Sequence, residues 1–326
     1  TEQRPTGGSF TPPPPDRVPV CTRATLQAAV DSYLEAQRTG NPRKLSLAGN
    51  VRVLQDMAPI EASQGLWNKP LVIAATNSVL DAVRCKTFTE VVVTEGTPYV
   101  IGTRLYVDEG RITRIDSLVT TKGDWLFNAN NYAHVMKMED WGVLPIAQRT
   151  RAQDMINGAN AYLDAFQDKH LEQPWGTPCE RTEGGAYTNV KGDPNSTCKV
   201  GIPNGVLYIV NRDYVVDEEK GVVQVYCRFG NSTNGMPDSH MFRYVNGKYR
   251  YVHTILGGAL AGVGGAFYSL SIVPTWVDGM TKGVGWIAIA LVIFGFWRPD
   301  LTLAGAYLFG GLSSLGLILK ARNVDI

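Results

Sequence analysis

The chain has 326 residues, of which 44% are hydrophobic and 19% are charged, and its formal net charge is +1. This balance offers no basic surface for nucleic acid, and the length suffices for two domains or more. The hydrophobic residues are spread unevenly, because residues 255–326 contain long uncharged runs that the preceding residues lack. We therefore expect a soluble part that is followed by a segment of another kind.

The first half of the soluble part is expected over residues 21–145, after an extended, proline-rich leader at 1–20. Residues 22–37 carry apolar side chains at helical spacing, with Thr22 as a possible cap and Gly40 as a stop. Strands are predicted next, with a tight turn at Glu109-Gly110 between the last two. They cover 88–93, 99–107 and 111–120.

A second copy of this plan is predicted over residues 146–254. A helix at 152–166 contains Ala-Tyr-Leu-Asp-Ala, which echoes Ser-Tyr-Leu-Glu-Ala at 32–36. The segment 106–116 echoes 244–253, and the alignment of Gly110 on Gly247 puts Asp116 at the place of His253. A helix followed by a bent antiparallel sheet, twice over, indicates an internal duplication of an α+β unit.

The end of the second copy reads as a β-hairpin that turns at Asn246-Gly247. Asn-Gly between two β-favouring runs is typical of a two-residue turn whose residues both need positive φ. Uninterrupted pairing around this turn puts Tyr244 opposite Tyr249, Phe242 opposite Tyr251 and His240 opposite His253. On this prediction, which a β-bulge would break, all six side chains share one face and the two imidazoles lie side by side.

Residues 255–326 are predicted to be a hydrophobic helical tail. The runs 255–273 and 301–319 contain no charge and are long enough to cross a bilayer, whereas the apolar run 286–297 is short. Lys and Arg positions in the tail agree weakly with a soluble part on the outside. We expect the chain to contact a membrane through residues 255–319.

The five cysteines indicate two disulfides. Cys179 and Cys198 bracket a loop rich in glycine, proline and asparagine, and Cys21 and Cys85 bracket the first helical stretch, which leaves Cys227 over. Five reduced core thiols are the alternative. Asn195 and Asn231 begin acceptor sequons for N-glycosylation. Together these features favour a secretory route, with the soluble part extracellular or outside a membrane that anchors it.

His240 and His253 are the best candidates for acid–base chemistry, with Asp238 or Glu183 as a carboxylate partner. Asp238 shares a face with His240 by alternation, and Glu183 lies in a glycine-flanked loop. The opposing interpretation is that both histidines are satisfied residues of the sheet and that the aromatic row is core. Predicted ligand contacts complete the candidate site; they are Tyr251, Phe242, Tyr187, Trp125 and Asp116.

Other chemistry finds little support in the sequence. Two histidines with a carboxylate suit a metal triad only weakly. No nucleophile motif and no phosphate-binding glycine loop is present. We therefore expect neither a metal nor a cofactor.

Residues 20–254 resemble the SnoaL-like cone fold of the nuclear-transport-factor-two superfamily, and more specifically a secreted fungal family of unknown function with two such halves. The motifs that carry the likeness are 120–128, 174–187 and 237–254. The resemblance implies a fold rather than a reaction, because the superfamily contains isomerases, cyclases, dehydratases and non-catalytic binders.

The tail resembles the C-terminal part of bacterial permease subunits of nucleoside-type ABC transporters over residues 257–320. The matching motifs are 258–262, 274–281, 285–295 and 297–299. The earlier spanning helices of that family have no counterpart here, so this chain cannot build a complete transport path.

Three functions remain open from the sequence. The chain could be an isomerase, cyclase or dehydratase that acts on a small apolar or aromatic molecule, or an extracellular module that only binds one. It could also be a membrane component that packs against a transporter partner. A homo-oligomer is compatible with each of them.

Overall fold

The computed structural model describes residues 21–199, 208–230, 235–257 and 307. The first half contains α1 (Arg23–Thr39), β1 (Leu47–Gln55), β2 (Ala58–Pro59), β3 (Ile73–Asp81), β4 (Lys86–Val93), β5 (Tyr99–Asp108) and β6 (Arg111–Thr120). The second half contains α3 (Ala152–Asp164), β7 (Trp175–Glu183), β8 (Ala186–Tyr187), β9 (Ile209–Asp217), β10 (Val222–Phe229), β11 (Met236–Val245) and β12 (Lys248–Leu256). Between them lies α2 (Ala129–Met138).

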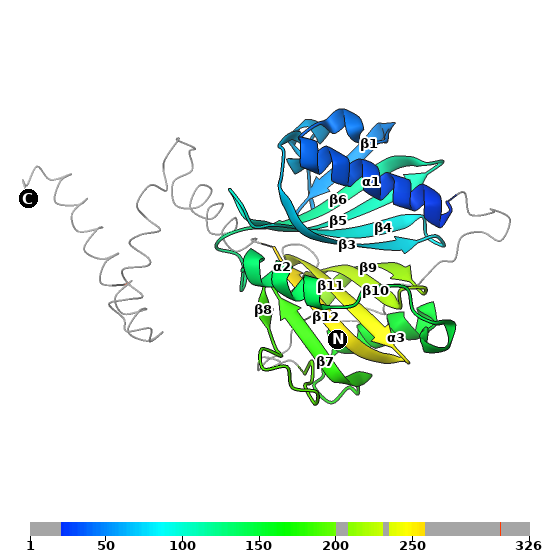
Figure 1. Cartoon of the computed structure of the whole chain (residues 1–326), viewed down its shortest axis with the longest axis vertical. Coiled ribbons are helices and arrows are strands. Elements are labelled where there is room, and N and C mark those ends of the chain that lie inside the picture. The colour runs from blue at the N-terminus through cyan, green and yellow to red at the C-terminus, as the bar shows by residue number, and fades with distance from the viewer. Residues whose placement is uncertain (1–20, 200–207, 231–234, 258–306, 308–326) are drawn as a thin grey trace, which may run out of the picture. The chain divides into compact units, whose positions relative to one another are not determined.

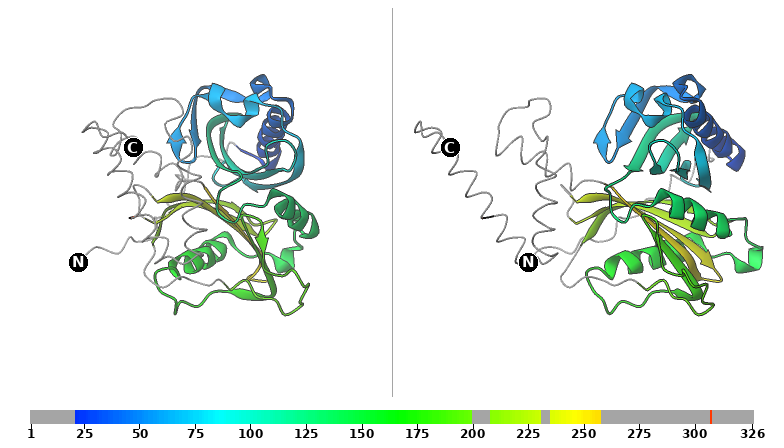
Figure 2. Two further views of the ribbon diagram at one scale, coloured as in Figure 1. Left: turned by 90° about the vertical axis from the view of Figure 1, so that its left-hand side faces the viewer. Right: turned by 60° about the vertical axis from the view of Figure 1, so that its left-hand side comes forward.

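Each half forms one six-stranded sheet, and the two sheets have the same strand order. The orders are β2-β1-β6-β5-β4-β3 and β8-β7-β12-β11-β10-β9. In both sheets one pair is parallel, β1 with β6 and β7 with β12, and the others are antiparallel. Both sheets are strongly curved (Figure 2). The observed class is α+β, and the shared order agrees with the predicted duplication.

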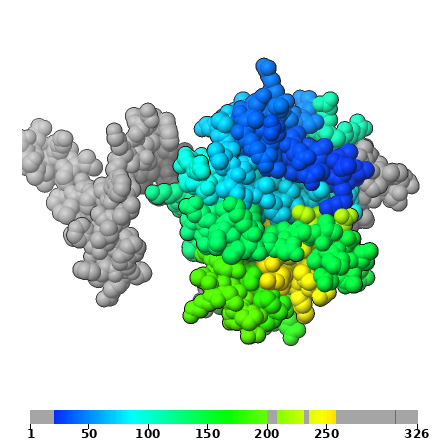
Figure 3. Space-filling view, viewed as in Figure 1, coloured from blue at the N-terminus to red at the C-terminus, as the bar shows by residue number. Residues whose placement is uncertain are grey.

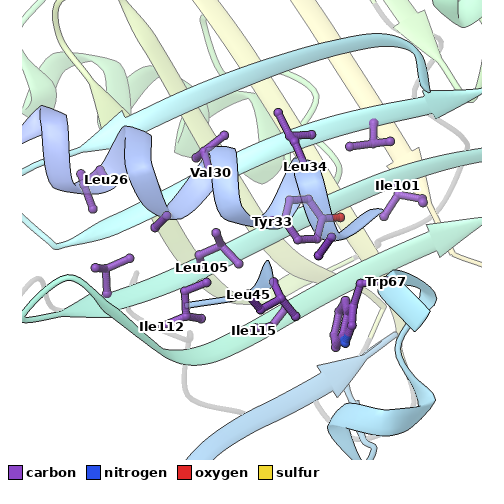
Figure 4. Packing of buried hydrophobic residues seen from close by; sticks show 14 of the residues in the cluster. Leu26, Val30, Tyr33, Leu34, Leu45, Trp67, Ile101, Leu105, Ile112 and Ile115 are labelled. Carbon is purple, nitrogen blue, oxygen red and sulfur yellow. The ribbon is translucent and has the colours of Figure 1, made fainter. Parts of the chain in front are cut away.

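The first core lies between α1 and the concave face of its sheet (Figures 1 and 4). Thr22 caps the helix, as predicted, by accepting a hydrogen bond from the Thr25 backbone N–H, and Gly40 ends it with a left-handed φ of 63°. The buried helix face packs on strand residues such as Ile101 and Leu105. The opposite face of α1 is exposed, as Figure 3 shows in dark blue. This division follows from the 3.6-residue period of the apolar positions.

The second core lies between α3 and the concave face of the second sheet. Tyr244 and Tyr249 hold the helix there, because their hydroxyls donate to the backbone carbonyls of Met155 (2.9 Å) and Gly158 (2.6 Å). Tyr162 of α3 packs edge-on against Phe242, with ring centroids 5.1 Å apart. The concave face of the second sheet is therefore rich in aromatic rings.

The β11–β12 hairpin turns at Asn246-Gly247 as predicted, with φ of 53° and 76°. The predicted pairing beyond Tyr244–Tyr249 is wrong, because Arg243 pairs with Tyr251 and leaves Arg250 as the extra residue of a β-bulge. The Arg250 guanidinium binds Glu180 at 2.9 Å. One extra residue moves all later side chains of β12 to the other face.

The two sheets also contact each other on the faces turned away from α1 and α3. Apolar clusters there join residues of both halves, among them Phe88 with Met241 and Val92 with Tyr226. Ion pairs also join the two halves, such as Lys86 of β4 with Asp213 of β9 (2.6 Å) and Arg23 of α1 with Asp217 of β9 (2.9 Å). The described residues between 21 and 257 thus form a pair of sheets with a buried, partly charged contact.

Several further sequence predictions can be compared with this structure. Strands β4, β5 and β6 confirm the predicted strands of the first half, and the disulfides Cys21–Cys85 and Cys179–Cys198 are confirmed, with Cys227 free. The leader at 1–20 and the tail beyond 257, apart from Tyr307, lie outside the described residues. Within the described residues, no helix is long and apolar enough to cross a membrane.

Candidate functional site

His240 lies on the concave face of the second sheet, at the centre of the candidate site. Its Nε2 lies 2.8 Å from Asp238 Oδ2, and its Nδ1 lies 3.1 Å from the Thr254 hydroxyl. The His240 ring stacks on Phe242 and also neighbours Tyr162. Asp238 and His240 meet because they are alternate residues of β11, as the sequence predicted.

Asp238 is fully buried, and its two oxygens have different surroundings. Oδ2 is hydrogen-bonded to His240 Nε2. The same oxygen lies 3.8 Å from the thiol of Cys227, a residue of β10 that pairs directly with Asp238. Oδ1 has no hydrogen-bond partner among the described residues. Burial, and then the nearby Asp238 carboxylate, raise the pKa of the Cys227 thiol well above its ordinary value, so the thiol keeps its proton at neutral pH.

Glu183 lies two strands from His240, on β7 beside Thr254. Its carboxylate binds Arg181 at 2.5 Å and accepts a hydrogen bond from the Trp125 indole at 2.6 Å. Burial is the main reason why the pKa of the Tyr162 hydroxyl is raised. The charges of Arg181, which lowers this pKa, and of Glu183, which raises it, also act on Tyr162. The structure therefore brings Asp238, His240 and Glu183 to one region, with the half-exposed Trp125 at its edge.

His253 is not part of this region, so the predicted histidine pair is wrong. The β-bulge at Arg250 pairs His253 with Met241 and His240 with Thr254, which puts the two imidazoles on opposite faces of the sheet. His253 Nδ1 lies 3.0 Å from Glu90 Oε2, and its Nε2 lies 2.6 Å from Glu139 Oε2. Because Glu90 belongs to the first sheet, His253 occupies the contact between the two halves.

The charge of His253 follows from these neighbours. Burial alone would lower the pKa of its imidazole, but the Glu139 and Glu90 carboxylates raise it to about 10. His253 is therefore an imidazolium at neutral pH. Tyr132 donates to Glu90 (2.9 Å) and Trp141 to Glu139 (3.0 Å), so this buried charge cluster is held by hydrogen bonds on both sides.

The bulge also divides the predicted aromatic row. Phe242 lies with His240, whereas Tyr251 lies on the other face beside Trp141. Tyr187 is half-buried near Glu180, and the pKa of its hydroxyl is raised to about 12, mainly by burial. Asp116 is a buried residue of the first sheet that binds Arg104 at 3.0 Å and Arg114 at 2.7 Å. Neither Tyr251 nor Asp116 shares the face of His240.

The first half has no acid or base at the corresponding place. Its sheet carries the same bulge, between Tyr106 and Val107, so Thr103 and Ser117 stand where His240 and Thr254 stand in the second half. Thr103 lies 3.0 Å from the Ser117 hydroxyl and 2.8 Å from the Tyr33 hydroxyl. This all-hydroxyl network contains no group that titrates near neutral pH. Of these two matching places, only the one in the second half has the means for proton transfer.

Three residues of the site were missed by sequence reasoning. Cys227, Thr254 and Tyr162 approach His240 and Asp238 from β10, β12 and α3. Strand alternation identifies residues that share a face of one strand, but it does not say which residue of β10 lies opposite Asp238. The segment between residues 229 and 236 is rich in glycine and asparagine, as turns are, but its length leaves the register of the two strands open. The only available clue was that Cys227 is left over when the other cysteines pair.

Comparison with family models gives two partial matches. A model described as a domain of unknown function (DUF8021) matches residues 148–256, which is the second half. A model described as the permease component of branched-chain amino acid transport systems matches residues 244–325. Each match covers less than half of the chain, and the two overlap in the last hairpin. The permease likeness of the tail is thus confirmed, while a fungal and secreted origin stays a prediction.

Curated relatives match the chain over short stretches. A protein of Haloferax volcanii, TsgC13, provisionally named a glucose ABC transporter permease, is 56% identical over 79 residues, which are 24% of either chain. The nucleoside permease protein NupC of Lactococcus lactis is 37% identical over 70 residues, or 22% of each. The guanosine permease protein NupQ of Bacillus subtilis is 35% identical over 71 residues, again 22% of each. The chain spans about a quarter of these relatives' length.

Two solved structures have a distant likeness to this chain. An NTF-2 like protein of unknown function from Burkholderia xenovorans is 11% identical, with a TM-score of 0.25, over 31% of this chain and 88% of its own. A protein from Kribbella flavida is 15% identical, with a TM-score of 0.22, over 35% of this chain and 99% of its own. Scores of this size carry no argument about function.

Proposed function

We propose that the second half is a SnoaL-like module that binds a small apolar or aromatic molecule, and that Asp238 and His240 move a proton on it. The observation that carries this proposal is the buried Oδ1 of Asp238, which has no partner among the described residues. A buried carboxylate oxygen without a hydrogen bond is costly, and a bound molecule would offset that cost.

The proposed roles follow from which atoms are engaged. Both nitrogens of His240 already have partners, so His240 is a positioning residue that holds Oδ2 of Asp238. Oδ1 takes a proton from a carbon next to a carbonyl group, the carbonyl oxygen of the bound molecule takes up the charge, and the same proton returns to a second carbon. This sequence is an isomerisation, the simplest reaction that one carboxylate can serve.

The aromatic side chains support the predicted class of ligand. Tyr162, Phe242 and Tyr249 lie on the face that holds Asp238, and such rings favour apolar or aromatic molecules. Trp125 at the edge is half-exposed and fixed by Glu183. We propose that the Trp125 indole borders the bound molecule, with Glu183 as the residue that positions it.

A test of proton transfer uses 2-tetralone, an aromatic ketone with exchangeable protons beside its carbonyl group. In deuterium oxide, the full chain should accelerate the loss of these protons, which proton NMR follows directly. Asp238→Asn should reduce the acceleration by about 100-fold or more, because general base catalysis contributes that much. Asp168→Asn, a change at an exposed carboxylate, is the matched control and should leave the rate unchanged.

The alternative, a module that binds without chemistry, has its own outcome in this experiment. Saturable broadening of the tetralone signals, without exchange above the buffer rate, would remove the proton-transfer role and leave a binding function. If tetralone neither binds nor exchanges, the preference for aromatic ketones is wrong.

A second proposal, that the chain is anchored in a membrane, is supported by the permease match over residues 244–325. The disulfides fit an oxidising compartment for the soluble part, and the exposed Asn195 can accept a glycan there. Expressed in full, the chain should stay in the membrane pellet after an alkaline carbonate wash. Its release into the supernatant would count against the anchor and leave the ligand-binding proposal untouched.

A further inference from the structure

We propose that Cys227, Asp238 and His240 form a zinc-binding site inside the second half, with a fourth coordination position open to a ligand. One sulfur, one oxygen and one nitrogen from these residues all lie within 4.8 Å of one another. Three protein ligands of these types with one open position are typical of zinc sites that act on a bound molecule. The inference goes beyond proton transfer and does not require it.

The distances between the three ligand atoms suit a tetrahedral zinc ion. Usual zinc bond lengths put a sulfur and an oxygen ligand about 3.5 Å apart, and a nitrogen and an oxygen about 3.3 Å apart. Cys227 Sγ lies 3.8 Å from Asp238 Oδ2, and His240 Nε2 lies 2.8 Å from the same oxygen. A zinc ion therefore requires that the His240–Asp238 contact lengthens by about half an ångström and that the Cys227 sulfur moves slightly toward Oδ2. The sulfur and the His240 nitrogen, which lie within 4.8 Å of each other, would then be about 3.5 Å apart.

Thr254 holds His240 in the orientation that a metal ligand needs. Histidines that bind a metal through one nitrogen usually donate the N–H of the other to a fixed oxygen. The Thr254 hydroxyl lies 3.1 Å from Nδ1 of His240, which leaves Nε2 to face Asp238 and Cys227. The hydrogen bond that would orient His240 as a metal ligand is thus already supplied by Thr254 on the neighbouring strand β12.

The charge at Asp238 also favours a cation. Its carboxylate is fully buried, and within the described residues no lysine or arginine forms an ion pair with it. Oδ1 accepts no hydrogen bond from any residue that the structure describes. A buried carboxylate needs a cation or several donors nearby. A zinc ion on Oδ2 would supply the charge and leave Oδ1 available for the ligand beside it.

The binding step has a simple balance. The Cys227 thiol gives up its proton to solvent as a bond forms between sulfur and zinc. The proton that His240 Nε2 shares with Asp238 is taken up at Nδ1, which then donates to Thr254, and the freed Nε2 lone pair binds the zinc ion. No oxidation or reduction takes place. The ion would then hold a ligand oxygen at the fourth position, next to Asp238 Oδ1, where it would polarise a carbonyl group.

The first experiment uses the unaltered full chain. Expressed in zinc-supplemented medium and purified without chelator, it should carry about one zinc ion per chain. Replacement by Co²⁺ should give visible bands of a tetrahedral ion and a near-ultraviolet thiolate-to-cobalt band. That band would identify Cys227, because the other four of the five cysteines are in disulfides. Zinc content near zero, or cobalt binding without the thiolate band, would overturn the proposal.

Variants then test the individual ligands, with circular dichroism as the check of folding. Cys227→Ser and His240→Asn should weaken zinc binding at least about 100-fold, and Thr254→Val by about 10–100-fold. Thr103→Val, which changes a buried threonine of the first sheet at the place that corresponds to His240, should have no effect on zinc binding. Unchanged zinc affinity in a folded Cys227→Ser variant would overturn the site.

Discussion

His253 illustrates how the surroundings of one side chain decide its role. The sequence suggested an acid–base partner for His240, but the ring lies between the Glu90 and Glu139 carboxylates, with Tyr132 and Trp141 on either side. A fully buried imidazolium with two anionic partners has no lone pair to offer a substrate. Its role is to join the two sheets.

The first prediction is that His253→Gln lowers the free energy of unfolding by about 3–5 kcal/mol at pH 7. Glutamine can fill the space, but it leaves the Glu90 and Glu139 carboxylates buried without a cation. Urea unfolding followed by circular dichroism measures this change. His134→Gln, on an exposed face of α2, is the control and should stay within about 0.5 kcal/mol of the parent. Equal stability of the two variants would contradict the imidazolium assignment.

The second prediction concerns pH. The pKa of His253 is about 10 in the folded chain, against an ordinary value of 6.5. A raised pKa means that the folded state holds the proton more tightly, so its stabilising contribution is complete below pH 6.5 and is lost as pH rises toward 10. The free energy of unfolding should therefore fall across this window. In His253→Gln the same titration should be clearly flatter; parallel curves would argue against this assignment.

Part of the candidate site followed from single strands, and the rest did not. Asp238 and His240 are alternate residues, so the sequence alone predicted their common face. The approach of Cys227 and Thr254 depends on how β10 and β12 are aligned with β11, and a pattern within one strand carries no information about that alignment. Side chains that meet within one strand were therefore predictable, whereas side chains that meet across neighbouring strands were not.

At the scale of elements, the bulge in the last hairpin determines which chemistry each face of the second sheet carries. The same bulge occurs in the first half, where Thr113 is the extra residue, as Arg250 is in the second. Both halves therefore use it to twist the closing strands of a curved sheet. The helices, the turns and most strands were predictable from local patterns. The bulge was not predictable, because the Asn246-Gly247 turn is compatible with a strand pair that contains a bulge and with one that does not.

The third prediction contrasts two glycines in turns. Gly184 has φ of 59°, and a Cβ there would collide with the backbone oxygen of Trp125, whereas Gly247 has φ of 76° and open space around it. Gly247→Ala should cost only the backbone strain, about 1–2 kcal/mol. Gly184→Ala should cost clearly more and also move the Trp125 segment. Thermal unfolding with tryptophan fluorescence separates the two effects, and equal losses would show that the Gly184 turn is free to shift.

At the scale of the whole described fold, charges hold the two sheets together. Asp213 of the second sheet lies 2.6 Å from Lys86 and 3.0 Å from Arg104 of the first, and it accepts a hydrogen bond from Tyr106 at 2.8 Å. Burial would raise the pKa of the Asp213 carboxyl, but the two cations lower it to about 2. The buried Arg104 of the first sheet thus takes part of its counter-charge from the second sheet.

The fourth prediction is that acid unfolds both halves together. Since the folded pKa of Asp213 is below its ordinary value of 3.8, its stabilising contribution is present above that pH and is lost as pH falls toward 2. Hydrogen exchange of peptides from β4 and from β10 should rise in parallel over this window. Asp213→Asn should raise exchange in both at neutral pH, while Asp168→Asn should raise it in neither. Exchange confined to one sheet would contradict the coupling.

The position of Cys227 has a consequence for how the protein reaches its final covalent state. The buried Cys227 sulfur carries either its proton or, in the proposed site, a zinc ion, so it is not free as a thiolate to attack the finished Cys179–Cys198 bridge. The mature molecule is therefore protected from scrambling its own cross-links. Before the sheet closes, the same sulfur is free to compete for either partner. Isomers with wrong disulfides should therefore form during oxidative folding and not after it. A Cys227→Ser chain should form its native disulfides with fewer mispaired intermediates.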